Sequence, residues 1–156
     1  MTRDQSEAAY YAWCRSQAMY EAARQLYPQS NPPQNYHDLV GDPYSKFLFA
    51  WLALTYTVVE YLYKFDEIPL EIREDCRNLR ESWKKFRNAV FHIKNHPLSE
   101  EYDALIHFPK SFDRIANIHD VCGKYVHHQL GFQFPAFVGT PARFFVPVLT
   151  PSKPKQ

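Results

Sequence analysis

Apolar residues recur at alternating steps of four and three between positions 72 and 93, the spacing of one buried face of an α-helix. Pro69 stands where a first helical turn accepts proline, and Pro97 disfavours helix at His96. We therefore predict a helix over residues 69–95, with an apolar seam suited to packing in a bundle. The seam residues are Ile72, Cys76, Leu79, Trp83, Phe86, Val90 and Ile93.

Four further segments predict helices. Residues 4–27 begin with Asp4 and Glu7, which resemble a capping box, and residues 111–130 end before Gly131. A third segment covers residues 44–65, and Ser99-Glu100-Glu101 caps a short helix from Tyr102 to Phe108. The expected inward residues are Ala12, Met19, Ala22, Ala23 and Leu26 in the first helix; Phe47, Trp51, Leu54, Val58, Tyr61, Leu62 and Phe65 in the second; and Phe112, Ile115, Ile118, Cys122, Tyr125, Val126 and Leu130 in the last.

The segments between and after these helices are rich in proline. Residues 28–43 carry four prolines and predict a surface crossover loop, with a lid or partner contact as the alternative. Residues 132–156 combine five prolines with five phenylalanines, which predicts an extended strap packed on the bundle or on a second subunit. The predicted fold is thus an all-α, up-and-down bundle of four to five helices over residues 1–131, followed by a strap over 132–156 whose last residues are frayed.

Composition narrows the class of protein. A chain of 156 residues predicts one domain, and 46% apolar residues supply a hydrophobic core. The net charge of +1 argues against a globally basic nucleic-acid binder, so phosphate would have to bind a local patch. The scattered cysteines Cys14, Cys76 and Cys122 are typical of reduced core thiols. The most apolar run, 47–63, contains polar residues and predicts a buried helix, so we expect a cytoplasmic protein that does not enter a membrane.

Three polar side chains stand late in the 69–95 helix: Arg87, Asn88 and His92. The guanidinium of Arg87 keeps its charge and offers a planar fork to phosphate. The imidazole of His92 can exchange a proton near neutral pH. RNA cleavage by the 2′-OH needs proton removal, proton delivery and charge stabilisation on the phosphorane, and this trio carries groups suited to those functions.

The spacing of the trio favours a site built from two copies. Asn88 and His92 are four residues apart and share a helix face, whereas Arg87 and His92 diverge by about 140°. Two copies that face each other across a symmetric interface bring the diverging groups together.

A basic stripe runs beside the apolar seam and leads into Arg87. It predicts an RNA phosphate track, with a solvated face carrying pairs such as Arg77 with Glu81 as the alternative. Glu60, the acid of the 44–65 helix, predicts a surface pair with Lys64, and an accessory role at the cleft is the alternative. The stripe consists of Arg73, Arg77, Arg80, Lys84 and, past Arg87, Lys94.

Arg87-Asn88-Ala89-Val90-Phe91-His92 resembles the Arg-polar-x-x-x-His motif of HEPN domains, and the helices around it fit over roughly residues 5–131. The resemblance implies a dimeric helical bundle, often a metal-independent endoribonuclease of toxin–antitoxin or other defence systems. It implies that Arg87, Asn88 and His92 line the dimer cleft, that RNA is the substrate, and that an antitoxin or regulatory protein is a partner.

One position departs from the pattern. HEPN toxins that are controlled by nucleotidyltransferase antitoxins carry a tyrosine two residues after the histidine, and Lys94 stands there. This argues against control by modification of that tyrosine. HEPN domains also serve as non-catalytic dimerisation, interaction or nucleotide-binding modules, which is the alternative function.

Other histidines offer competing sites. Arg114 and His119 repeat the arginine-to-histidine spacing, but a hydrophobic residue follows the arginine. His92 and His96 have the spacing of a zinc pair without the glutamate of His-Glu-x-x-His. His127-His128 is interpreted as a surface feature. We therefore predict no metal, and the isolated glycines form no phosphate loop, so no cofactor is expected.

Overall fold

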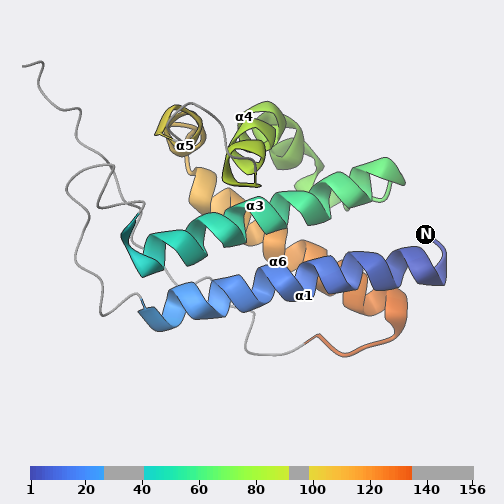
Figure 1. The fold of residues 1–156 in the computed structure, drawn as a ribbon. Coiled ribbons are helices and arrows are strands. Elements are labelled where there is room, and N and C mark those ends of the chain that lie inside the picture. The colour runs from blue at the N-terminus through green and yellow to red at the C-terminus, as the bar shows by residue number, and fades with distance from the viewer. Residues whose placement is uncertain (27–40, 92–98, 135–156) are drawn as a thin grey trace, which may run out of the picture.

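The computed structural model describes residues 1–26, 41–91 and 99–134, and these residues form a bundle of five α-helices without strands (Figure 1). The helices are α1 (Arg3–Leu26), α3 (Pro43–Lys64), α4 (Arg73–Phe91), α5 (Ser99–Ile106) and α6 (Ser111–Leu130), with the short 3-10 turn η2 (Leu70–Ile72) before α4. The predicted all-α bundle is confirmed. Of the strap, only residues 132–134 are described, and the crossover loop over 28–40 also lies outside the described residues.

Helix α3 is the centre of the bundle. It lies antiparallel to α1 on one side and packs against α4 on the other, while α6 passes behind both α1 and α3 (Figure 1). The predicted inward face was wrong in part: Trp51, Val58 and Leu62 are buried, whereas the other four predicted residues (Phe47, Leu54, Tyr61 and Phe65) are only partly buried. Buried residues instead surround most of the helix. They are Tyr44, Ser45, Leu48, Phe49, Trp51, Leu52, Ala53, Thr55, Tyr56, Val58, Val59 and Leu62.

The ends of the helices follow local chemistry. At α3, the carboxylate of Asp42 accepts the backbone N–H of Ser45 at 2.9 Å, and Pro43 occupies the first turn. At α6, Gly131 takes the left-handed conformation, with φ of 69°, and its N–H bonds back to the last carbonyls of the helix. The predicted helix over Tyr102–Phe108 is shifted, because α5 already begins at Ser99 and ends at Ile106.

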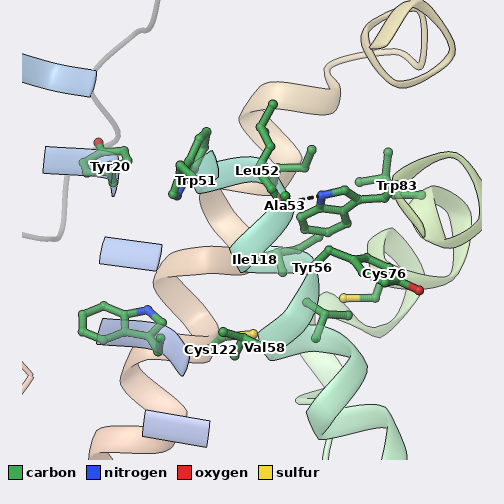
Figure 2. Close-up of a cluster of buried hydrophobic side chains, with 14 of the residues drawn as sticks. Tyr20, Trp51, Leu52, Ala53, Tyr56, Val58, Cys76, Trp83, Ile118 and Cys122 are labelled. Carbon is green, nitrogen blue, oxygen red and sulfur yellow. Dashed lines mark hydrogen bonds between the residues drawn. The ribbon is translucent and has the colours of Figure 1, made fainter. Parts of the chain in front are cut away.

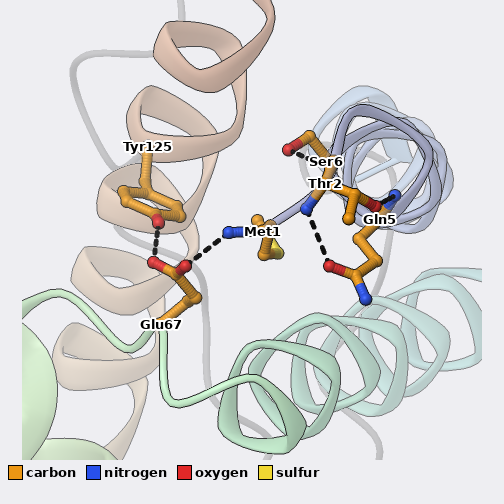
Figure 3. A network of polar contacts seen from close by, with 6 residues as sticks. All are labelled: Met1, Thr2, Gln5, Ser6, Glu67 and Tyr125. Carbon is orange, nitrogen blue, oxygen red and sulfur yellow. Dashed lines mark hydrogen bonds and ion pairs between the residues drawn. The ribbon is translucent and has the colours of Figure 1, made fainter.

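The start of α1 corrects the predicted capping box. Thr2 accepts the backbone N–H of Gln5 at 3.3 Å, and the Gln5 side chain accepts the N–H of Thr2 at 2.8 Å (Figure 3). The capping box is therefore formed by Thr2 and Gln5, two residues earlier in the chain than the predicted pair of Asp4 with Glu7.

A polar network joins α1, α6 and the turn after α3 (Figure 3). The carboxylate of Glu67 accepts the amino group of Met1 at 2.6 Å and the hydroxyl of Tyr125. These two hydrogen bonds hold the pKa of Glu67 below its usual range. Burial, followed by the nearby carboxylate, raises the pKa of Tyr125 to about 12.

The core between α3, α4 and α6 is dense in aromatic rings (Figure 2). The predicted seam of α4 is confirmed from Ile72 to Phe86, all fully buried or nearly so, while Val90 is partly buried and Ile93 lies outside the described residues. Cys76 and Cys122 are buried thiols, as predicted, and burial raises the pKa of Cys76 to about 12. Cys14 is only partly buried.

The predicted inward face of α1 was wrong in part. Of the predicted residues only Ala23 is buried, and the face instead carries bulky rings beside small polar side chains. Ser16 hydrogen-bonds Thr55 of α3 at 2.7 Å, so its hydroxyl is satisfied inside the core. The buried residues of α1 are Ser6, Ala9, Trp13, Ser16, Gln17, Tyr20 and Ala23.

Candidate functional site

Arg87 lies in the last turns of α4 and reaches across to α3. Its Nη2 donates to Oε2 of Glu60 at 2.5 Å, and its guanidinium carbon lies 5.5 Å from the centroid of the Tyr56 ring. The contact therefore combines an ion pair with a cation–π contact. Both partners come from α3, 27 residues or more away in the sequence.

The two partners of the ion pair differ in their access to water. The side chain of Glu60 is 45% exposed and that of Arg87 is 18% exposed. The Nε of Arg87 is buried and has no hydrogen-bond partner among the described residues. The guanidinium of Arg87 is thus a cation held in one position at the rim of the bundle, with the exposed carboxylate of Glu60 as its counter-ion.

Arg80 of α4 also packs on a tyrosine ring of α3. Its guanidinium carbon lies 4.8 Å from the centroid of the Tyr63 ring. Burial, together with the charge of Glu60, raises the pKa of Tyr56, whereas the charges of Arg80 and Arg87 lower it. Tyr56 is 2% exposed, so its ring is a fixed surface under Arg87.

The basic stripe of α4 is only partly free. Arg80 and Arg87 contact side chains of α3, and Arg73 donates a hydrogen bond to the backbone carbonyl of Ile68 at 3.2 Å. Arg73, Arg77, Arg80 and Lys84 are all exposed. Lys84 lies between Arg80 and Arg87, the two arginines that contact tyrosine rings of α3.

The structure corrects the predicted partner of Glu60. Glu60 pairs with Arg87 and not with Lys64, whose amino group instead lies 5.6 Å from the centroid of the Phe65 ring. Glu60 is thereby brought to Arg87. A signal for this pairing exists in the sequence: Tyr56, Glu60 and Tyr63 share one face of α3, as Arg80, Lys84 and Arg87 share one face of α4.

The rest of the predicted trio is only partly described. Asn88 is partly buried beside Arg87. His92 and Lys94 lie outside the described residues, as does His96, which shares with His92 the spacing of a zinc pair that we did not predict to bind metal. The last described residue of α4, Phe91, is 47% exposed.

The competing pair Arg114 and His119 forms no open site. Arg114 binds Asp75 at 2.7 Å and covers the ring of Phe108, whereas His119 is 3% exposed. Burial lowers the pKa of His119 to about 3. A histidine in this position is held neutral and out of reach of a substrate.

The prediction for His127 was wrong. It is buried, and its Nδ1 lies 2.7 Å from the carbonyl oxygen of Gly123. The ring also meets the edges of Trp13 and Phe134. Only its neighbour His128 is exposed, because adjacent helical residues point about 100° apart.

Within the described residues, no three His, Cys, Asp or Glu side chains are grouped as metal ligands would be. No helix in the described part of the chain is long and apolar enough to span a bilayer.

Comparison of the chain with family models, with curated proteins and with solved structures gave no match in any of the three. Any assignment therefore depends on the residues and on their arrangement.

Proposed function

We propose that this protein is a HEPN-type, metal-independent endoribonuclease that acts as a homodimer. The observation that carries the proposal is Arg87, held on the Tyr56 ring and paired with the exposed Glu60 at the rim of the bundle. A cation fixed before substrate arrives needs little reorganisation when charge develops on a phosphorane. Asn88 is the next residue, and His92 follows it by four positions.

In the proposed reaction, His92 exchanges protons with the attacking 2′-OH and the leaving 5′-oxygen. Arg87 stabilises the charge on the phosphorane, and Asn88 orients the reacting groups. Because Arg87 and His92 diverge by about 140° on one helix, the second copy supplies the missing side of the site. The exposed ring of Phe91 supports an apolar contact between copies near this point.

One observation favours a second function. The ion pair of Arg87 with Glu60 joins α4 to α3, so it also suits a non-catalytic dimerisation, interaction or nucleotide-binding module in which Arg87 cross-links the bundle. In that case the trio supports the fold and no RNA is cleaved.

Cleavage of single-stranded RNA in the presence of a chelator separates the two functions. The nuclease leaves a 2′,3′-cyclic phosphate, and a 2′-deoxy substitution at the cleaved position blocks the reaction. His92→Ala should abolish cleavage without lowering the melting temperature. The exposed His128→Ala is the matched control, since His119 is buried and its loss would disturb the core.

An inactive wild type would support the module. A wild type that is monomeric at micromolar concentration by light scattering, yet active, would contradict the composite site.

A further inference from the structure

The anion-binding group of the proposed site is already occupied by a carboxylate of the same chain. We infer that Glu60 takes, in the free protein, the place on Arg87 that a backbone phosphate of single-stranded RNA takes in the complex, and that RNA displaces it. This inference rests on the proposed function and adds that the carboxylate of Glu60 competes with RNA for Arg87.

The geometry allows one anion to replace another. A carboxylate and a phosphate both accept from the guanidinium fork, which offers five N–H donors, and one contact to Glu60 is at hydrogen-bond distance. The pair is part-buried, and a phosphate that replaces Glu60 keeps the charge of Arg87 compensated, so the exchange costs less than loss of the pair without a replacement. Glu60 is the more exposed partner and moves into water, while Arg87 stays.

The seat of Arg87 does not depend on Glu60. The Tyr56 ring lies beneath the guanidinium, and that ring is held in the core at 2% exposure. Removal of the Glu60 charge should therefore free the guanidinium for phosphate without releasing the side chain from its position.

A polyanion can approach along the same helix. Lys84 is exposed and precedes Arg87 by three residues, about 4.5 Å along the helix axis. A strand whose phosphate contacts Lys84 is thereby brought to Arg87, where it competes with Glu60.

The test is binding of a 2′-O-methyl RNA 12-mer, which keeps the backbone charge and lacks the nucleophile, measured by fluorescence anisotropy in chelator. Glu60→Gln should bind about three- to fivefold more tightly than the wild type, the gain expected when a competing carboxylate that is partly screened by solvent is removed. The dependence of log K on log salt should stay close to that of the wild type, because a phosphate contacts Arg87 in both complexes and only the competing carboxylate is lost.

Two controls isolate Arg87. Glu81→Gln removes the same charge from an exposed position on α4 and should change affinity little. In an Arg87→Gln background, the gain from Glu60→Gln should vanish. Glu60→Ala should behave as Glu60→Gln does, so that instability of one variant leaves the other to decide.

Each outcome decides the inference. It is overturned if Glu60→Gln binds no more tightly than the wild type, if the gain persists without Arg87, or if neither protein binds the oligonucleotide. If Glu60→Gln binds more tightly but the wild type cleaves no RNA, the displacement of Glu60 is supported and the nuclease proposal is contradicted. If the wild type cleaves RNA but Glu60→Gln binds no more tightly, the nuclease proposal is supported and the displacement of Glu60 is contradicted.

Discussion

The indole N–H of Trp83 in α4 donates to the backbone carbonyl of Leu52 in α3 at 2.8 Å, and both side chains are fully buried (Figure 2). The residue at the middle of the α4 seam therefore joins the two helices by a hydrogen bond as well as by its ring. The register of α4 on α3, and with it the placement of Arg87 on Tyr56, depends on this contact.

Trp83→Ala should lower the free energy of unfolding by about 3–5 kcal/mol, because it leaves a cavity the size of an indole. Trp83→Phe should lower the free energy of unfolding by less, because it keeps most of the ring. What it loses is chiefly the hydrogen bond. Urea denaturation measures both. Lys85→Ala, on the exposed side of the same helix, should stay within about 0.5 kcal/mol of the wild type. Equal losses for Trp83→Ala and Lys85→Ala would rule out this role for the indole.

Protonation of His119 should destabilise the fold in mildly acidic solution. Its ring stacks between Trp13 and Tyr20, with centroids 5.4 and 5.8 Å away, and burial lowers its pKa from 6.5 to about 3. Between these two values the unfolded chain binds the proton and the folded chain does not. Stability is therefore complete above about pH 6.5 and falls as pH decreases, by up to ~1.4 kcal/mol per pH unit.

Unfolding of the wild type and of His119→Phe at pH 7.5, 6.5 and 5.5 measures this effect. The variant should show a flatter dependence on pH because it lacks the titrating group, whereas His128→Phe should keep the slope of the wild type. Matching slopes for the wild type and His119→Phe would assign the pH dependence to other groups.

Gly123→Ala should destabilise the contact between α1 and α6. A Cβ at this position would lie 2.6 Å from the ring of Trp13 and 2.7 Å from that of Phe134. Trp13 has little freedom to move, since its indole N–H donates to the carbonyl of His119 at 3.0 Å. We expect a loss of about 1–3 kcal/mol from overpacking.

The matched control for that substitution is Gly41→Ala, where nothing lies within 4 Å of an added Cβ. Its melting temperature should equal or slightly exceed that of the wild type. Phe134→Ala in the Gly123→Ala background should recover part of the loss, because the contact with Trp13 remains. An unchanged melting temperature for Gly123→Ala would show that the two rings shift freely.

The sequence predicted the helices and the α4 seam because these depend on local spacing. It failed on the inward face of α1, since a face that includes Ser16 and Gln17 looks polar until Thr55 is placed opposite Ser16. It also failed on α3, because a helix enclosed by neighbours has no single face to recognise.

Arg87 was predicted to be a candidate site residue, but Glu60 was not identified as the residue that pairs with it. The local rule for charged residues four apart favoured Lys64 for Glu60, whereas the observed partner lies on another helix. Only the packing of α4 on α3, set by contacts such as that of Trp83 with Leu52, brings Glu60 to Arg87. That arrangement is a property of the packed core and not of either segment.

The enclosure of α3 has a consequence for the life of the protein under stress. If thermal motion lifted α1 away, the side of α3 that carries Trp51 would face water, because Trp51 packs against Tyr20 of α1. Such intermediates associate with one another faster than they refold when the chain is concentrated. Heat damage to this protein should therefore depend on concentration and be hard to reverse, with survival set by how rarely the bundle opens rather than by its equilibrium stability.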